Sequence, residues 1–118
     1  VMRLPETLLL RAEAYIAKGD KASALADVNT IRARAKAPLA TVNQMDINYI
    51  LDERVRELYG EEFRMLTLMR LGLLFDRVKK YGGATQSATV SAKNNLLPIP
   101  QSEIDRNIGA KLVQNPGY

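Results

Sequence analysis

Three glutamates in the middle of the chain have the residue type and spacing for acid–base chemistry. Glu53, Glu57 and Glu61 follow one another at intervals of four residues, so one uninterrupted helix would carry all three on the same face. Two carboxylates on either side of a sugar ring are the arrangement that glycoside hydrolysis requires. A glycan-cleaving enzyme is therefore one function to weigh for this chain.

The basic residues of the same segment favour a structural role instead. Arg54, Arg56 and Arg64 lie within the same turns, and Glu–Arg pairs three or four positions apart on a helix usually stabilise it. Gly60 stands between the second and third glutamate and is expected to break the helix there. We interpret the group as an ion-pair network that locks helices together, and we assign no catalytic residue. The group comprises Glu53, Arg54, Glu57 and Arg64.

The chain has few residues that could perform thiol, imidazole or metal chemistry. The chain has no cysteine and no histidine, which excludes a disulfide, a thiolate nucleophile, a structural zinc site and a histidine-based dyad. Glu103, Asp105 and Asn107 lack the central glycine and the terminal glutamate of a calcium loop. The Gly82-Gly83 pair is typical of a helix end rather than of a phosphate loop. The sequence thus predicts no cofactor and no metal site.

Four of the five tyrosines are candidates for stacking on sugar rings: Tyr49, Tyr59, Tyr81 and Tyr118. A sugar site needs aromatic faces beside convergent polar groups in a concave surface. Tyrosines at helical spacing are more often core or rim residues, and the chain has no tryptophan and only 6% aromatic residues. We therefore expect core or rim positions for these side chains, and the ligand-binding residues stay unassigned.

The chain carries a net positive charge, and its basic residues are spread along the sequence. There are 17 basic and 13 acidic side chains, which gives a formal net charge of +4. Such a balance can suit nucleic acid or anionic lipid, but the basic residues are spread from Arg3 to Lys111 and alternate with acidic ones. The densest cluster, Arg32, Arg34 and Lys36, falls at an expected helix end, where cations interact favourably with the helix dipole. With no aromatic platform beside the charge, we expect no nucleic-acid partner.

Apolar periodicity predicts two helix pairs, over about 5–36 and 46–80. In the first pair, Gly19 is expected to end one helix and Asp20 to cap the next. Ala12 and Ala24 are the small residues that let the two helices approach, as in a tetratricopeptide unit. Asn43 or Asp46 is the expected cap of the following helix.

Helical segments are expected from Glu61 to about Arg70 and from Leu73 to Tyr81. The run from Met65 to Phe75 is apolar on nearly all sides, which predicts burial in a core or a face covered by a partner. No apolar run approaches the roughly 18 residues of a membrane-spanning helix. We therefore expect no transmembrane segment.

The last third of the chain predicts an arm with little regular structure, residues 84–118. Residues 84–90 are small and polar and are expected to form a loop, and the prolines at 98 and 100 predict an extended stretch over 94–100. A helical turn at 102–106 and a turn-forming tail at 114–118 are expected to follow. The predicted fold class is all-α, with antiparallel tetratricopeptide-like helix pairs and an extended Pro-rich C-terminal arm.

Three sequence blocks carry a resemblance to a known family. They are LLLRAEAY at 8–15 with ALADVNTIRAR at 24–34, LDERVREL at 51–58 continuing to Gly72, and LPIPQSEI at 97–104 with QNPGY at 114–118. In this order and with these gaps, the blocks resemble the SusD/RagB family over nearly all 118 residues. The chain departs from the usual family pattern at Met65-Leu66-Thr67, where Trp-Phe-Asp is common, and at Leu71, where Trp is common.

The resemblance implies a nutrient-binding protein rather than an enzyme. Members of the family are lipid-anchored at the cell surface of the outer membrane. They cover a SusC-like TonB-dependent transporter, to which they deliver oligosaccharides or, in some members, peptides. Residues 1–118 would be the C-terminal helical domain, a fragment of the whole protein, with the oligosaccharide held by residues N-terminal to it. Two alternatives from other classes stay open, a free-standing tetratricopeptide-like interaction module and the glycan-cleaving enzyme considered above.

Overall fold

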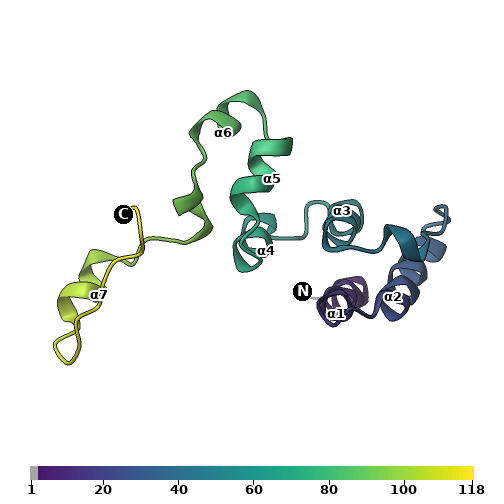
Figure 1. Ribbon diagram of the computed structural model, residues 1–118, viewed down its shortest axis with the longest axis horizontal. Helices are drawn as coiled ribbons and strands as arrows, with labels where there is room; N and C mark the ends of the chain where they lie inside the picture. Colours follow the sequence, from purple (N-terminus) through teal and green to yellow (C-terminus); the bar gives the residue numbers. More distant parts are fainter. Residues whose placement is uncertain (1–2) are drawn as a thin grey trace. The chain divides into compact units, whose positions relative to one another are not determined.

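The computed structural model describes residues 3–118, and this part of the chain contains seven α-helices, two short 3-10 helices and no strand. It divides into two compact units, residues 1–62 and 63–118. Figure 1 shows the helices of both units along the chain. The all-α fold class is confirmed, whereas the boundaries of the domain within a longer protein stay a prediction.

The first unit is an antiparallel helix pair with a third helix packed against it. Its helices are α1 (Leu4–Ala17), α2 (Lys21–Arg34) and α3 (Ile47–Glu57), with the 3-10 helix η1 (Val42–Gln44) before α3. Gly19, at a φ of +80°, makes the turn after α1. The Asp20 carboxylate then caps α2 by accepting a 3.0 Å hydrogen bond from the Ser23 amide. Asp46 caps α3 in the same way. It is one of the two caps that the sequence offered, and the other, Asn43, lies in η1.

The core of the first unit is small and tightly closed. Leu9, Val28 and Ile50, one from each helix, are completely buried. Ala12 and Ala24 are also completely buried in the same cluster. Exposure of either alanine would have contradicted the tetratricopeptide register, and both are inaccessible to solvent.

Replacing Ala24 with leucine is expected to lower the free energy of unfolding by about 1–3 kcal/mol, because the site has no room for three further carbon atoms. Ala26→Leu, at an exposed position of the same helix, is the matched control and is expected to have little effect. Chemical denaturation of both variants measures the difference. Equal effects at the two positions would mean that the helices of the pair separate easily.

The second unit is built from shorter helices. These are α4 (Arg64–Arg70), α5 (Leu74–Tyr81), α6 (Ala84–Thr89) and α7 (Gln101–Arg106), with the 3-10 helix η2 (Ala92–Asn95) after α6. The prediction of a loop at 84–90 is wrong, because residues 84–89 are helical. The Ser87 hydroxyl donates to the carbonyl oxygens of Val78 and Gly82 at 3.0 and 3.1 Å. These contacts attach α6 to the end of α5. The small, polar side chains of α6 give no indication of them in the sequence.

The apolar run from Met65 to Phe75 is divided between two helices, with the break after Arg70 that the sequence predicts. Gly72, at a φ of +68°, divides it between α4 and α5. Leu68 and Leu74 are buried, but Met65 and Leu66 are 53% and 51% exposed. Burial in a core is therefore wrong for the start of the run, and the alternative expectation, a face that a partner covers, stays a prediction.

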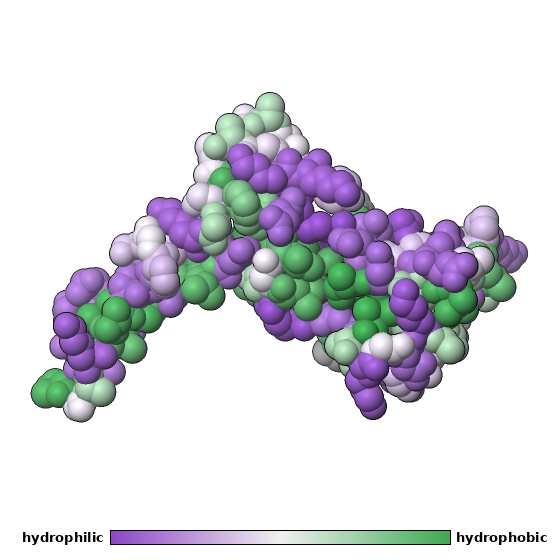
Figure 2. Space-filling model, viewed as in Figure 1, coloured by the Kyte–Doolittle hydropathy of each residue, from purple (hydrophilic) through white to green (hydrophobic). Residues whose placement is uncertain are grey.

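The C-terminal arm folds back on itself. Leu96 and Pro100 have extended backbones as predicted, whereas residues 94 and 95 belong to η2. The Gln114 side chain accepts a hydrogen bond from the Ile99 amide and donates one to its carbonyl, both at 2.8 Å. The Tyr118 hydroxyl donates to the Leu96 carbonyl at 3.0 Å. Figure 2 shows apolar surface, in green, over α7 and the loop that follows it, where Ile108 is 98% exposed.

Candidate functional site

The three glutamates with catalytic spacing do not share one helix face. Glu53 and Glu57 lie on α3, which ends at Glu57. Gly60 adopts a φ of +75° in the turn that follows, so Glu61 stands outside the helix. The break predicted at this glycine is therefore present.

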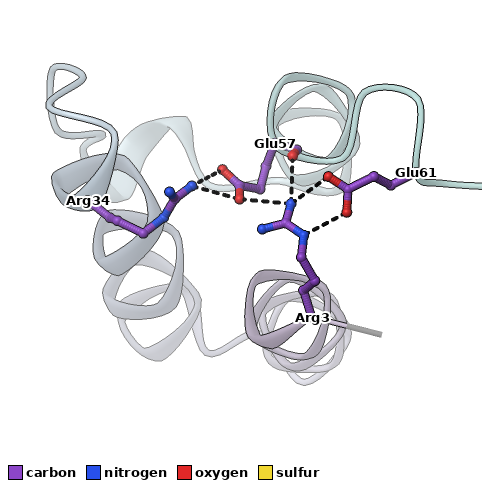
Figure 3. Close-up of polar contacts among 4 residues, drawn as sticks. All are labelled: Arg3, Arg34, Glu57 and Glu61. Atoms are coloured by element: carbon purple, nitrogen blue, oxygen red, sulfur yellow. Dashed lines mark hydrogen bonds and ion pairs between the residues drawn. The ribbon is translucent and has the colours of Figure 1, made fainter. Parts of the chain in front are cut away.

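Glu57 joins all three helices of the first unit (Figure 3). Its carboxylate accepts hydrogen bonds from Arg34, at the end of α2, at 2.7 and 2.8 Å. Arg3, which precedes α1, donates to the Glu57 backbone carbonyl at 3.3 Å and contacts its carboxylate at 3.4 Å. The same guanidinium binds Glu61 through two parallel hydrogen bonds of 2.6 and 2.8 Å. The cluster thus fixes the start of α1 to the ends of α2 and α3.

Glu53, one turn earlier on α3, also forms ion pairs with arginines. Its buried carboxylate accepts from Arg32 at 2.7 Å and from Arg56 at 2.6 and 2.9 Å. Arg32 and Arg34 were expected only to interact with the dipole of their own helix. In the structure they also supply the partners of Glu53 and Glu57. No helical spacing could reveal these pairs, because the partners lie 21 and 23 residues apart.

A third ion pair is buried almost completely. The side chains of Arg54 and Glu62 are 3% and 6% exposed, and the Arg54 Nε donates to Glu62 Oε1. Glu62 lies beyond the helix that carries Arg54, so no helical spacing indicates this pair. Arg64, which was grouped with these residues, begins α4 in the second unit.

This arrangement stabilises a fold and leaves little for acid–base chemistry. A catalytic carboxylate must reach the substrate with its proton available for transfer, but Glu53, Glu57 and Glu61 each accept from one or two guanidinium groups. Among residues 3–118, no group of three histidine, cysteine, aspartate or glutamate side chains is arranged to hold a metal ion. No helix in the described part of the chain is long and apolar enough to cross a membrane.

The Arg3–Glu61 pair predicts a specific response to acid. The hydrogen bonds from Arg3 lower the pKa of Glu61 below its ordinary value of 4.5. A carboxylate whose pKa is lower in the folded state contributes stability above its unfolded pKa, and this contribution is lost as the pH falls through the folded value. Glu61→Gln removes the contribution, so this variant is expected to lose less stability than the parent chain between neutral pH and acid. Thermal melting across this range measures the effect. The control, Glu103→Gln, should follow the parent chain, and identical curves for all three proteins would refute the prediction.

The four tyrosines occupy different environments. Tyr49 packs against the core of the first unit, with Arg56 5.6 Å from its ring centroid. Tyr81 has Arg77 at 4.9 Å and Lys80 at 5.0 Å from its ring. Tyr118 has Lys93 at 4.8 Å. Cations therefore lie over three of the rings, whereas Tyr59 is 86% exposed. None of the four lines either of the two grooves described next.

Two shallow grooves of comparable size are described next, one formed by residues of the first unit and one by residues of the second. In the first unit a groove of about 420 Å³ lies between α1 and α2, with Leu4, Leu8 and Ile31 on its walls and two arginines at its edge. In the second unit a groove of about 430 Å³ is lined by α4, α5 and the α6–η2 segment. Neither groove is lined by a carboxylate, and neither combines an aromatic face with the convergent polar groups that a sugar site needs.

Comparison with known proteins gives one consistent result. The model of the SusD family matches residues 1–118. The starch-binding protein SusD of Bacteroides thetaiotaomicron is 35% identical over the whole chain, and the SusD-like protein P2 of Formosa agariphila is 32% identical over 99% of it. The chain spans 21% and 25% of the lengths of these two relatives. The solved structure of BT4246 superposes with a TM-score of 0.74 and 26% identity, over all of this chain and 23% of that one.

Proposed function

This chain belongs to the SusD family, and from that premise we propose that it is part of a cell-surface protein that captures a glycan as a nutrient at the outer membrane. The whole protein would deliver its ligand to a SusC-like TonB-dependent transporter. The observation that carries this proposal is the family match over the full chain, supported by a relative whose name describes starch binding.

The family match also bears on the alternative of a free-standing tetratricopeptide-like module. Such a module needs its helix pairs, but it has no use for the arm at 84–118. The match and both relatives extend over this arm as well as over the helices. The observations therefore favour the nutrient-binding protein over the module.

The role proposed for these 118 residues is that of a scaffold without catalytic activity. The carboxylates that have catalytic spacing are held in ion pairs between helices. Neither groove is lined by an aromatic side chain, which a sugar site needs beside its polar groups. We therefore propose that oligosaccharide is held by parts of the full-length protein outside this chain.

The proposal predicts that the 118-residue chain alone does not bind the glycan that the full-length protein binds. Calorimetric titration of both proteins with the same oligosaccharide measures this, after circular dichroism has established that the short chain is folded. Heat of binding is expected for the full-length protein only. Comparable affinity for the two proteins would place the site within this chain, with Tyr59 as the first side chain to replace.

The transporter partnership needs a separate experiment. The tagged full-length protein is purified from outer membranes of its own bacterium in mild detergent, and co-purifying proteins are identified by mass spectrometry. A TonB-dependent barrel in stoichiometric amount is the expected result. Glycan binding without any barrel partner would leave the capture role standing and overturn delivery to a transporter.

A further inference from the structure

Three side chains near the end of the chain hold a loop closed. The side chains of Gln114, Asn115 and Tyr118 bind backbone groups of residues 96–99 through hydrogen bonds of 2.7–3.0 Å. We call these three side chains the C-terminal clamp. Because the clamp follows the loop and its partners precede it, residues 100–113 form a surface loop whose two ends lie side by side (Figure 1).

The part of this loop that follows α7 has an exposed backbone with almost no hydrogen bonds. Residues 107–111 and Val113 are exposed, and Leu112 is half-buried. The Ala110 amide donates to the Asn107 side chain at 3.3 Å. Among residues 3–118, no other backbone group of residues 108–113 forms a hydrogen bond. A protease can therefore bind this segment in an extended conformation without breaking any secondary structure.

Lys111 lies within this segment, in surroundings that differ from those of the other basic residues. Of the 17 lysines and arginines, 13 lie within helices. Outside the helices, the Arg3 carbonyl accepts hydrogen bonds from the first turn of α1, and the amides of Lys18 and Lys36 donate to carbonyls of the preceding turns. Within the described part of the chain, Lys111 is the only basic residue whose neighbours on both sides lack backbone–backbone hydrogen bonds.

We propose that the peptide bond between Lys111 and Leu112 is a processing site for a protease that cuts after basic residues. The lysine side chain enters a specificity pocket that has a carboxylate at its base, and residues 108–113 lie extended across the active site of the protease. Hydrolysis breaks the bond between the Lys111 carbonyl carbon and the Leu112 nitrogen. Water supplies a hydroxyl group to the carbon and a proton to the nitrogen. This site goes beyond nutrient capture, because it does not depend on any glycan.

Cleavage at this bond also opens the C-terminal clamp. All three clamp side chains lie in the fragment 112–118, which non-covalent contacts alone then attach to the rest of the chain. Each hydrogen bond contributes little net free energy, and the covalent link that kept the effective concentration of the fragment high is gone. The fragment therefore dissociates and leaves the backbone of residues 96–99 without these partners.

The first test is digestion of the 118-residue chain and of the full-length protein with a limiting amount of trypsin, followed by mass spectrometry. The first cut within residues 1–118 is expected after Lys111 in both proteins. Lys111→Gln is expected to slow the loss of the intact 118-residue chain at least about tenfold, because cutting elsewhere first requires local opening of the backbone. The control Lys18→Gln, at a position that is also exposed, should be cut as fast as the parent chain. An earlier cut at another basic residue, or resistance of the Lys111 bond in the full-length protein, would overturn the proposal.

Opening of the clamp is measured by hydrogen exchange of the Ile99 amide, which donates to the Gln114 side chain. This amide is expected to lose its protection after cleavage, and to lose it equally in uncut Gln114→Ala, which lacks the acceptor. The Leu58 amide donates to the Arg54 carbonyl at 2.8 Å in the first unit and should keep its protection in both samples. Unchanged exchange at Ile99 after complete cleavage would show that the clamp survives, which contradicts its opening.

Use of the site in the cell is tested on the full-length protein isolated from its own bacterium. The protein is digested with a protease that cuts after glutamate, so that the cut after Glu103 begins a peptide at residue 104. Processed molecules are expected to yield a peptide of residues 104–111, which ends at Lys111. Recovery only of peptides that continue past Leu112 would overturn the assignment of a processing site, even if trypsin cuts there.

Discussion

Replacing Glu62 with glutamine is expected to lower the free energy of unfolding by about 3–5 kcal/mol, one of the two largest effects predicted for this chain. Glutamine has nearly the shape of glutamate but no charge, and the Arg54 guanidinium beside it is only 3% exposed. Arginine cannot release its proton within a protein, so the variant buries a positive charge without its counter-charge. Chemical denaturation followed by circular dichroism measures the loss.

The loss of stability is severe because the Arg54 guanidinium already lacks one hydrogen bond. Its Nη1 atom is already buried without a hydrogen-bond partner in the part of the chain that the structure describes. Removing the carboxylate also weakens the contact of its Nε. The replacement therefore adds to the desolvation cost of the Arg54 guanidinium that the native fold already carries.

Two controls separate the buried charge from loss of a hydrogen bond in general. Arg56→Gln removes a half-exposed partner of Glu53, which keeps its bond to Arg32, and is expected to cost less than about 1 kcal/mol. The double variant Arg54→Met/Glu62→Leu removes both charges and is expected to recover most of the loss. If Arg56→Gln and Glu62→Gln destabilise the chain equally, burial of the Arg54–Glu62 pair has no special importance.

The features that the sequence predicted well are local ones. Asp20 and Asp46 each accept a backbone hydrogen bond from the residue three positions later, and Gly19 and Gly60 adopt the positive φ that favours glycine. Such features depend on neighbouring residues alone. Burial of Ala12 and Ala24 was also predictable, because the helix period places both on the face between α1 and α2.

The features that the sequence did not predict depend on residues far apart in the chain. Arg3 and Glu61 are 58 positions apart and no periodic pattern relates them. Residues 84–89 are helical although their composition is that of a loop, because Ser87 bonds to the end of α5. Exposure of Met65 had no signal either, since an apolar residue looks the same whether it faces a core or solvent. These are the positions at which tertiary contacts override local preference.

The second large effect is expected from Leu9→Ala, which should lower the free energy of unfolding by about 2–5 kcal/mol. Leu9 lies on α1, is completely buried, and belongs to the cluster that joins the three helices of the first unit. The loss combines the transfer of the missing carbon atoms to water with the cavity that rigid neighbours leave behind. In a unit of about 60 residues the core is small, so this is a large share of a total stability that seldom exceeds about 10 kcal/mol.

Leu4→Ala provides the matched control on the same helix, because Leu4 is 69% exposed and a surface change of this kind should cost within about 0.5 kcal/mol. Both variants are measured by denaturant unfolding with a probe in the first unit, such as the fluorescence of a tryptophan introduced at the half-buried Tyr49. The midpoint should move strongly for Leu9→Ala with an unchanged slope, because the cavity leaves the surface exposed on unfolding nearly the same. A shift of similar size for Leu4→Ala would show that the Leu4 side chain is covered in solution. Because Leu4 lines the groove between α1 and α2, something outside the described residues would then fill that groove.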